Sequence, residues 1–144
     1  MLKDNFDPHE FFLAGATVHP AVVVDFNGVL DTFKGWTGRV QDYDPAEGAL
    51  DFVRRLKEEL GYKTVFVLTA TMPIESVVAW IRRYGFDQYV DYVTNHKVPA
   101  QVYVDDRAVL HSGDFNETLE KIRGFKPHWE IPETLKETKE VRAL

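Results

Sequence analysis

The chain has 144 residues, carries a formal net charge of −6 and contains no cysteine; 44% of its residues are hydrophobic and 28% are charged. This length suits one ordinary domain, and the composition is that of a globular protein. The absence of cysteine excludes disulfides and thiolate metal sites and fits a cytoplasmic protein. The negative charge argues against a broad nucleic-acid surface, and without a signal-like start or a long apolar run we expect no membrane association.

The first part of the chain predicts one buried strand and one helix. Residues 1–20 show no clear period and form an N-terminal segment. The β-branched run 21–24 predicts a strand buried on both faces. Residues 31–44 mix glycine, threonine, tryptophan and charge, and predict a loop or short flap. An Asp-Pro-Ala-Glu start followed by an apolar face then predicts a helix over 44–60, stopped by Gly61.

The second part of the chain repeats this alternation. An apolar run predicts a strand over 64–68, and a helix with an inward stripe follows over 73–85. Shorter apolar runs predict strands over 89–93 and 101–104, and a further helix is expected over 115–122. Helical crossovers between apolar strands are typical of parallel sheets. We therefore predict a doubly wound, Rossmann-like α/β/α fold with three layers and a mostly parallel central sheet.

Polar side chains follow the predicted strands, where ligands bind in open α/β sheets. They are Asp25 and Asn27 after the first strand, Thr69 after the second, Lys97 in a later loop, and Asp105 and Asp106 after the last strand. Converging carboxylates repel one another unless a cation lies among them. An all-oxygen donor set favours Mg²⁺, and a hydroxyl and an ammonium could bind phosphoryl oxygens. The pattern therefore indicates phosphoryl transfer, for which an aspartate can act as the nucleophile.

These residues resemble the four motifs of the haloacid dehalogenase (HAD) superfamily, in the same order along the chain. The motifs correspond to Asp25-Phe26-Asn27-Gly28-Val29-Leu30, Thr69, Lys97 and Val104-Asp105-Asp106. The resemblance covers most of the chain, and the segments after Asp106 are similar to small uncharacterised HAD-like proteins of bacteria and phages. That closer similarity indicates no substrate.

The resemblance implies a role for each motif residue. Asp25 would be the nucleophile and a metal ligand, and the backbone carbonyl of Asn27 a second ligand. Thr69 and Lys97, with Asn27 and Gly28 of the first motif, would bind the phosphoryl group. Asp105 and Asp106 would complete the Mg²⁺ site, and either of them could be the direct ligand.

The resemblance also implies a domain organisation without a large cap. A HAD-like domain would occupy residues 21–125 with its short flap at 31–44. The N-terminal segment 1–20 would precede it, and a tail at 126–144 would pack on it or fray. An open site of this kind suits a phosphorylated small molecule or macromolecule, or needs an oligomeric partner as a lid.

Asn27 departs from the phosphatase pattern, in which an aspartate at this position protonates the leaving group and then activates water. An amide is not a general acid or base, and losing that role typically costs ~10²–10⁴-fold in rate. Three explanations remain open: an engineered substitution, a slow phosphatase for substrates with good leaving groups, or a module that binds phosphorylated ligands with little turnover.

Other functions fit the pattern less well than a phosphatase does. A dehalogenase needs no metal, and a sugar phosphomutase needs a cap. In a receiver domain the acidic pair follows the first strand, whereas here it comes last. A nucleic-acid or nucleotide end phosphatase and a catalytically impaired binding or regulatory module stay as alternatives. Trp36, Arg39, His96 and His111 could line the mouth of the site, although packing or surface roles are the simpler interpretation.

Overall fold

The computed structural model describes residues 1–4, 6–13, 19–35 and 43–130. The chain divides into two compact units, one of residues 1–33 and 38–105 and one of residues 34–37 and 106–144. Trp36, Arg39, half of the predicted flap (residues 36–42) and residues 131–144 of the predicted tail lie outside the described residues.

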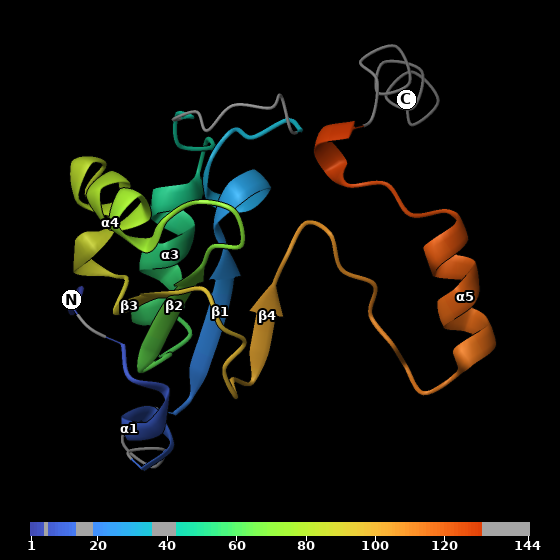
Figure 1. The fold of residues 1–144 in the computed structure, drawn as a ribbon, viewed down its shortest axis with the longest axis horizontal. Helices are drawn as coiled ribbons and strands as arrows, with labels where there is room; N and C mark the ends of the chain where they lie inside the picture. Colours follow the sequence, from blue (N-terminus) through green and yellow to red (C-terminus); the bar gives the residue numbers. More distant parts are fainter. Residues whose placement is uncertain (5, 14–18, 36–42, 131–144) are drawn as a thin grey trace. The chain divides into compact units, whose positions relative to one another are not determined.

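Four parallel strands form the sheet of the first unit, in the order β3-β2-β1-β4 (Figure 1). The strands are β1 (Ala21–Asp25), β2 (Thr64–Leu68), β3 (Tyr92–Thr94) and β4 (Val102–Val104). The predicted α/β class is confirmed, and every strand pair in the described sheet is parallel. A Rossmann-like arrangement is compatible with this sheet.

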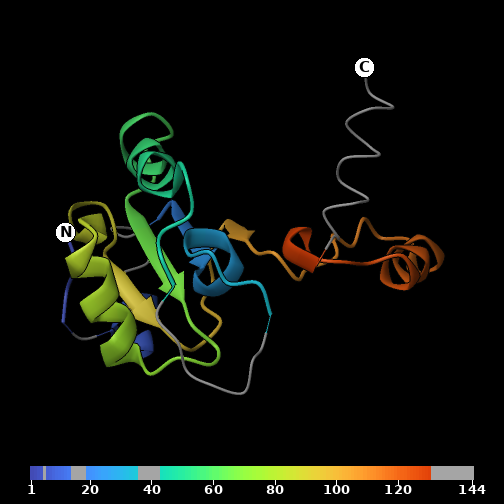
Figure 2. The ribbon, with the colours of Figure 1, turned by 90° about the horizontal axis from the view of Figure 1, so that it is seen from above.

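The central strand β1 is buried along its whole length, as its β-branched run predicts. Successive side chains of a strand point to opposite faces, so the run supplies two cores. Val22 and Val24 pack in a core with the helices α3 (Ala49–Glu58) and α4 (Ile74–Arg83). Figure 2 shows both helices beside the strands. Val23 packs in a second core on the other face.

The helix α3 begins later than the sequence predicts. The sequence signals place its first turn at residues 44–48, but Gly48 has a left-handed backbone with φ of 82°. Pro45 instead pairs with Asp31 in an isolated antiparallel bridge. Proline at this point therefore belongs to the connection from the β1 loop, not to a helix start. The predicted helix after Pro73 is confirmed, and its Trp80 is buried.

The second face of the sheet is covered by the N-terminal segment, where the sequence predicts no element. There, α1 (Pro8–Leu13) places Phe11 in the second core, with its ring 5.0 Å from that of Phe66. Both α3 and α4 lie on the first face, and the described connection between β3 and β4 contains no helix. In this unit, then, a short N-terminal helix and loops form the layer where crossover helices were expected.

The third strand is shifted along the chain from its predicted position at 89–93. A short 3₁₀ turn, η2 (Phe86–Gln88), precedes it, and the amides of Tyr89 and Val90 donate to the Phe86 carbonyl, each over 3.0 Å. These amides are therefore used in a turn, and β3 begins at Tyr92.

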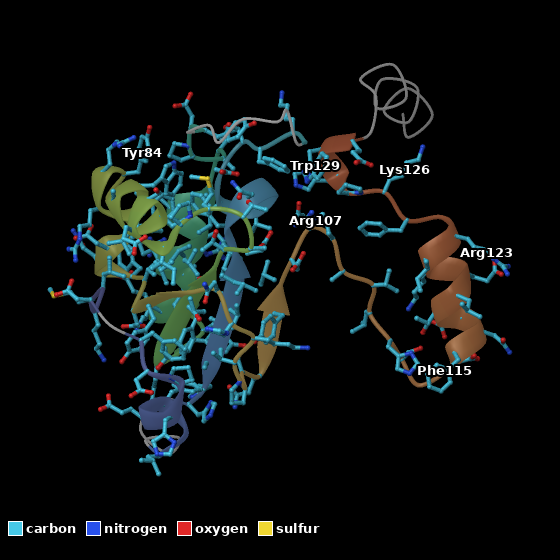
Figure 3. All side chains as sticks on the ribbon, viewed as in Figure 1. Tyr84, Arg107, Phe115, Arg123, Lys126 and Trp129 are labelled. Carbon is cyan, nitrogen blue, oxygen red and sulfur yellow. The ribbon has the colours of Figure 1, made fainter. Side chains whose placement is uncertain are left out.

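The second unit contains α5 (Phe115–Arg123) and a single 3₁₀ turn, η3 (His128–Glu130), among its described residues. The predicted helix at 115–122 is confirmed. Asp114 caps it by accepting hydrogen bonds from the amides of Asn116 and Glu117. Figure 3 labels Phe115 and Arg123 at its two ends. In the described parts of both units, no helix combines the length and apolar character needed to cross a membrane.

Candidate phosphoryl-transfer site

The ends of the central strands bring the predicted site residues to one edge of the sheet. Asp25 is the last residue of β1 and is paired with Leu68 at the end of β2, and Val24 is paired with Val104 at the end of β4. Because the strands are parallel, the residues that follow them emerge at the same edge. Thr69 and Asp105 therefore flank Asp25 from the two neighbouring strands.

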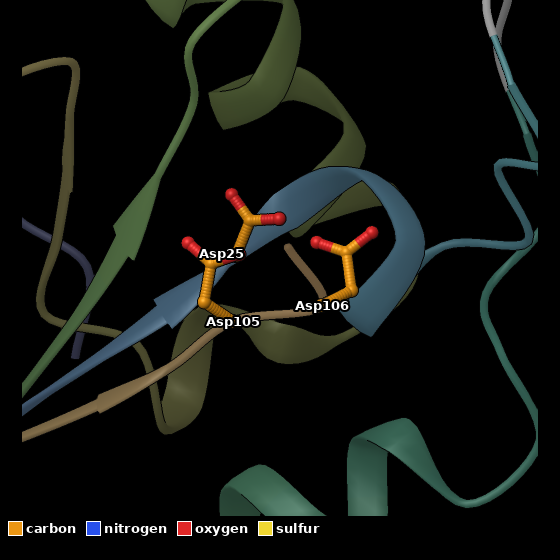
Figure 4. Close-up of side chains that lie close together, drawn as sticks. All are labelled: Asp25, Asp105 and Asp106. Carbon is orange, nitrogen blue, oxygen red and sulfur yellow. The ribbon is translucent and has the colours of Figure 1, made fainter. Parts of the chain in front are cut away.

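Three carboxylates come together at this edge (Figure 4). One oxygen from each of Asp25, Asp105 and Asp106 lies within 4.8 Å of the others. Asp25 is buried, with 7% of its surface exposed, whereas Asp105 is exposed and Asp106 is intermediate. Negative charges this close repel one another, and a divalent cation would relieve that repulsion. The donors are all hard oxygens, so they fit Mg²⁺ or a similar ion.

Asp106 has a further contact within the second unit. Its Oδ2 atom accepts a hydrogen bond from the indole N–H of Trp129. Ligating carboxylates are commonly oriented by such outer hydrogen bonds. The sequence predicts no partner for Asp106, and the tryptophan lies 23 residues further along the chain.

The loop after β1 is closed by Asp31, which the sequence patterns did not identify. Its Oδ1 atom accepts hydrogen bonds from the amides of Gly28 (2.9 Å) and Phe33 (3.1 Å), and the side chain is 3% exposed. Gly28 has φ of 87°, a conformation that favours glycine. An aspartate that accepts from the amide two residues ahead is a common loop signal, and this signal could have identified Asp31.

The side chain of Asn27 is held at both ends. Its Nδ2 atom donates to Asp31 Oδ2 over 2.6 Å, and its Oδ1 atom accepts from the Thr71 hydroxyl over 3.2 Å. A carboxylate offers no proton, so the Asn27 atom that faces Asp31 must be the nitrogen. The amide therefore has one defined orientation.

Thr69 serves the turn that leads into α4. It is 1% exposed, and its hydroxyl both donates to the Met72 carbonyl and accepts from the Met72 amide, each over 3.1 Å. Its own amide donates to the Thr94 carbonyl at the end of β3. The structure thus places Thr69 beside the β1 end, as predicted, with its hydroxyl in a local turn.

Lys97 is exposed in the loop between β3 and β4, and its ammonium lies 5.5 Å from the centre of the Tyr103 ring. Among the described residues it forms no ion pair with the three carboxylates. Its loop is fastened by Tyr103, whose hydroxyl accepts from the Val98 amide over 2.6 Å and donates to the Val98 carbonyl. Burial raises the pKa of Tyr103, and the bond to the Val98 backbone opposes this in part.

The two histidines considered for the mouth of the site differ in position. His96 is exposed in the β3–β4 loop, where its amide donates to the Thr94 hydroxyl. His111 belongs to the second unit, where its ring contacts Thr118 and Phe115. These contacts are local, in agreement with surface roles.

A scan against known protein families finds no match to this chain, and searches of curated proteins and of solved structures find none either.

Proposed function

We propose that this chain is a Mg²⁺-dependent phosphatase of the HAD type that forms an aspartyl-phosphate on Asp25. The observation that carries the proposal is the grouping of Asp25, Asp105 and Asp106 within 4.8 Å at the end of the central parallel strand. The motif resemblance, with its acidic pair after the last strand, adds to this. The compatible parallel sheet supports the same interpretation.

In this proposal one carboxylate oxygen of Asp25 attacks phosphorus, and the bond from phosphorus to the leaving group breaks. The Asp25, Asp105 and Asp106 side chains, with the Asn27 carbonyl, would hold the cation, which offsets negative charge on the phosphoryl oxygens when bound. Lys97 contributes its ammonium from the end of a flexible stem. Asp31 and Gly28 shape the loop that carries Asn27.

Labelling of Asp25 tests the proposal directly. The unsubstituted chain is incubated with acetyl phosphate and Mg²⁺, quenched in acid and examined by intact-mass and peptide mass spectrometry. We expect one added phosphoryl group on Asp25, and none in a matched Asp25→Asn variant. No adduct on Asp25 together with no release of phosphate would overturn the proposal.

A second candidate is a phospho-ligand-binding or regulatory module with little turnover. The specific observation in its favour is the Asn27 side chain, which is engaged by Asp31 and Thr71 and offers no acid or base. Binding of a phosphorylated ligand that leaves Asp25 unmodified would favour this module over the enzyme.

A further inference from the structure

We infer that this site takes its phosphoryl group from acyl phosphates and discriminates against alkyl phosphate esters. The inference rests on the proposed function and adds to it the class of substrate. It follows from the way in which Asp31 and Thr71 hold Asn27.

Asn27 can offer a leaving group a hydrogen bond but no proton. Its amide donates to Asp31 and accepts from Thr71, so its orientation is set from both ends. The remaining N–H can form a hydrogen bond to a departing oxygen, but an amide does not transfer a proton at neutral pH. Asn27 is thus a hydrogen-bond donor without acid function.

The carboxyl groups near Asn27 already have other roles. Both oxygens of Asp31 accept hydrogen bonds from N–H groups, and the side chain is 3% exposed. Asp31 therefore acts as an acceptor in this loop. In the proposed function Asp25 attacks phosphorus, and Asp105 and Asp106 hold the cation. These three carboxylates therefore stay ionised and do not donate a proton.

The leaving group determines whether the reaction needs a proton. When Asp25 attacks an acyl phosphate, the P–O bond breaks, and its electron pair leaves on a carboxylate that needs no proton. The conjugate acid of that leaving group has a pKa of about 4, like the carboxyl groups of proteins. An alkyl ester would expel an alkoxide, about as basic as hydroxide, whose departure needs a proton that the Asn27 amide cannot transfer.

Asp31 favours an amide over a carboxylate at position 27. A carboxylate at position 27 would face Asp31 Oδ2 at the 2.6 Å now spanned by an N–H···O hydrogen bond. Two carboxylates at that distance repel each other unless they share a proton. The Asn27→Asp substitution is therefore combined with Asp31→Asn, which gives the new carboxyl group an amide partner in place of a second carboxylate.

Rates of Asp25 labelling test the inference. Acetyl phosphate and ethyl phosphate are each mixed with the full chain and Mg²⁺ in three proteins. The Asp25 adduct is followed by quenched intact-mass spectrometry, and the acetate or ethanol that leaves is measured in the same samples. The three proteins are the unsubstituted chain, Asp31→Asn alone, and Asn27→Asp combined with Asp31→Asn. Circular dichroism and melting temperature establish that each protein is folded.

We expect the unsubstituted chain to release acetate from acetyl phosphate at least ~10²-fold faster than it releases ethanol from ethyl phosphate. The double variant should gain ~10²–10⁴-fold with ethyl phosphate and less than about tenfold with acetyl phosphate, because only the alkoxide needs a proton. Asp31→Asn alone should keep the selectivity of the unsubstituted chain.

Equal rates of release from the two donors in the unsubstituted chain would overturn the inference and leave the proposed function standing. An unchanged selectivity in the folded double variant would overturn it as well. No labelling of Asp25 by either donor would instead remove the proposed function on which the inference rests.

Discussion

Asn27 and Asp31 form a hydrogen-bonded loop directly after Asp25, the proposed nucleophile. Asp25 ends the central strand, and two residues later Asn27 donates to Asp31 and accepts from Thr71. Asparagine can form both bonds, whereas an ionised aspartate could form only the one with Thr71. The amide of Asn27 thus satisfies both of its hydrogen-bond partners.

The first prediction at this scale concerns Asn27→Asp. The new carboxylate would lie beside Asp31 and replace a charge-assisted hydrogen bond with repulsion, so we expect a loss of about 1–3 kcal/mol in the free energy of unfolding. Urea denaturation at neutral pH measures it. Adding Asp31→Asn should recover most of the loss, and a single variant as stable as the unsubstituted chain would contradict the contact.

The second prediction concerns Tyr103→Phe, which removes the hydroxyl that fastens Val98 in the Lys97 loop. Leaving these backbone groups without their partner should cost about 1–3 kcal/mol at neutral pH. Because the folded pKa of Tyr103 is raised, the protonated form is favoured in the fold. The contribution is then complete below about pH 10, the ordinary tyrosine pKa, and is lost as the pH rises through the folded value.

Urea titrations of both proteins at pH 7 and at increasing pH above about 10 check this prediction. The stability difference between them should shrink as the hydroxyl ionises. A difference that stays constant through this range would show that the ring, and not its hydroxyl, carries the effect.

At the scale of elements, the connection from β1 to α3 differs from its prediction for a local reason. Asp31 and Pro45 pair across the connection, and Gly48 turns the chain into α3 with φ of 82°. The residue types at 44–47 favour a helix start. In the structure, however, the Pro45 backbone pairs with Asp31 and is not part of a helix. The capping preference of a short segment is worth about 1 kcal/mol, which tertiary contacts readily exceed.

Gly48→Ala gives the prediction at this scale. A Cβ added to Gly48 would meet no atom within 4 Å beyond its chain neighbours, so the cost should arise from the left-handed backbone alone. We expect a loss of about 1–2 kcal/mol, measured by chemical denaturation. Gly48→Asn is the matched control and should cost less, since asparagine tolerates this conformation. Equal stability of the alanine variant would contradict a left-handed Gly48.

At the scale of the whole molecule, the acidic edge of the sheet should link folding to cation binding. Oxygens of three carboxylates lie within 4.8 Å of one another, and their repulsion opposes folding until a cation is bound. A ligand that binds the folded chain at one hundred times its dissociation constant adds about 2.7 kcal/mol of stability.

We therefore expect millimolar Mg²⁺ to raise the melting temperature, and chelation to reverse the shift. Sodium chloride at equal ionic strength controls for general screening. Asp105→Asn should reduce the response to Mg²⁺ and, by relieving repulsion, should not lower the melting temperature of the metal-free chain. The same Mg²⁺ response in the unsubstituted chain and the variant would exclude Asp105 as a ligand.

Local sequence pattern was enough to predict several features of the fold. The run from Ala21 to Val24 is apolar throughout, which requires burial on both faces and therefore a central strand. Parallel strands place their carboxyl ends at one edge, so the sequence predicted Asp25 and Asp105 at the same edge of the sheet. Their proximity also requires β4 to lie beside β1, which the tertiary structure decided. The helix after Pro73 likewise followed from its apolar period.

Tertiary structure decided the features that depend on which backbone and side-chain groups meet. Thr71 reaches Asn27 across 44 residues because β2 pairs with β1, and Tyr103 reaches Val98 because the β3–β4 loop folds back on β4. The second core needed Phe11 from a segment without periodicity. Hydrogen bonds act over a few ångströms, so the partner of a polar side chain depends on the packing that local patterns do not encode.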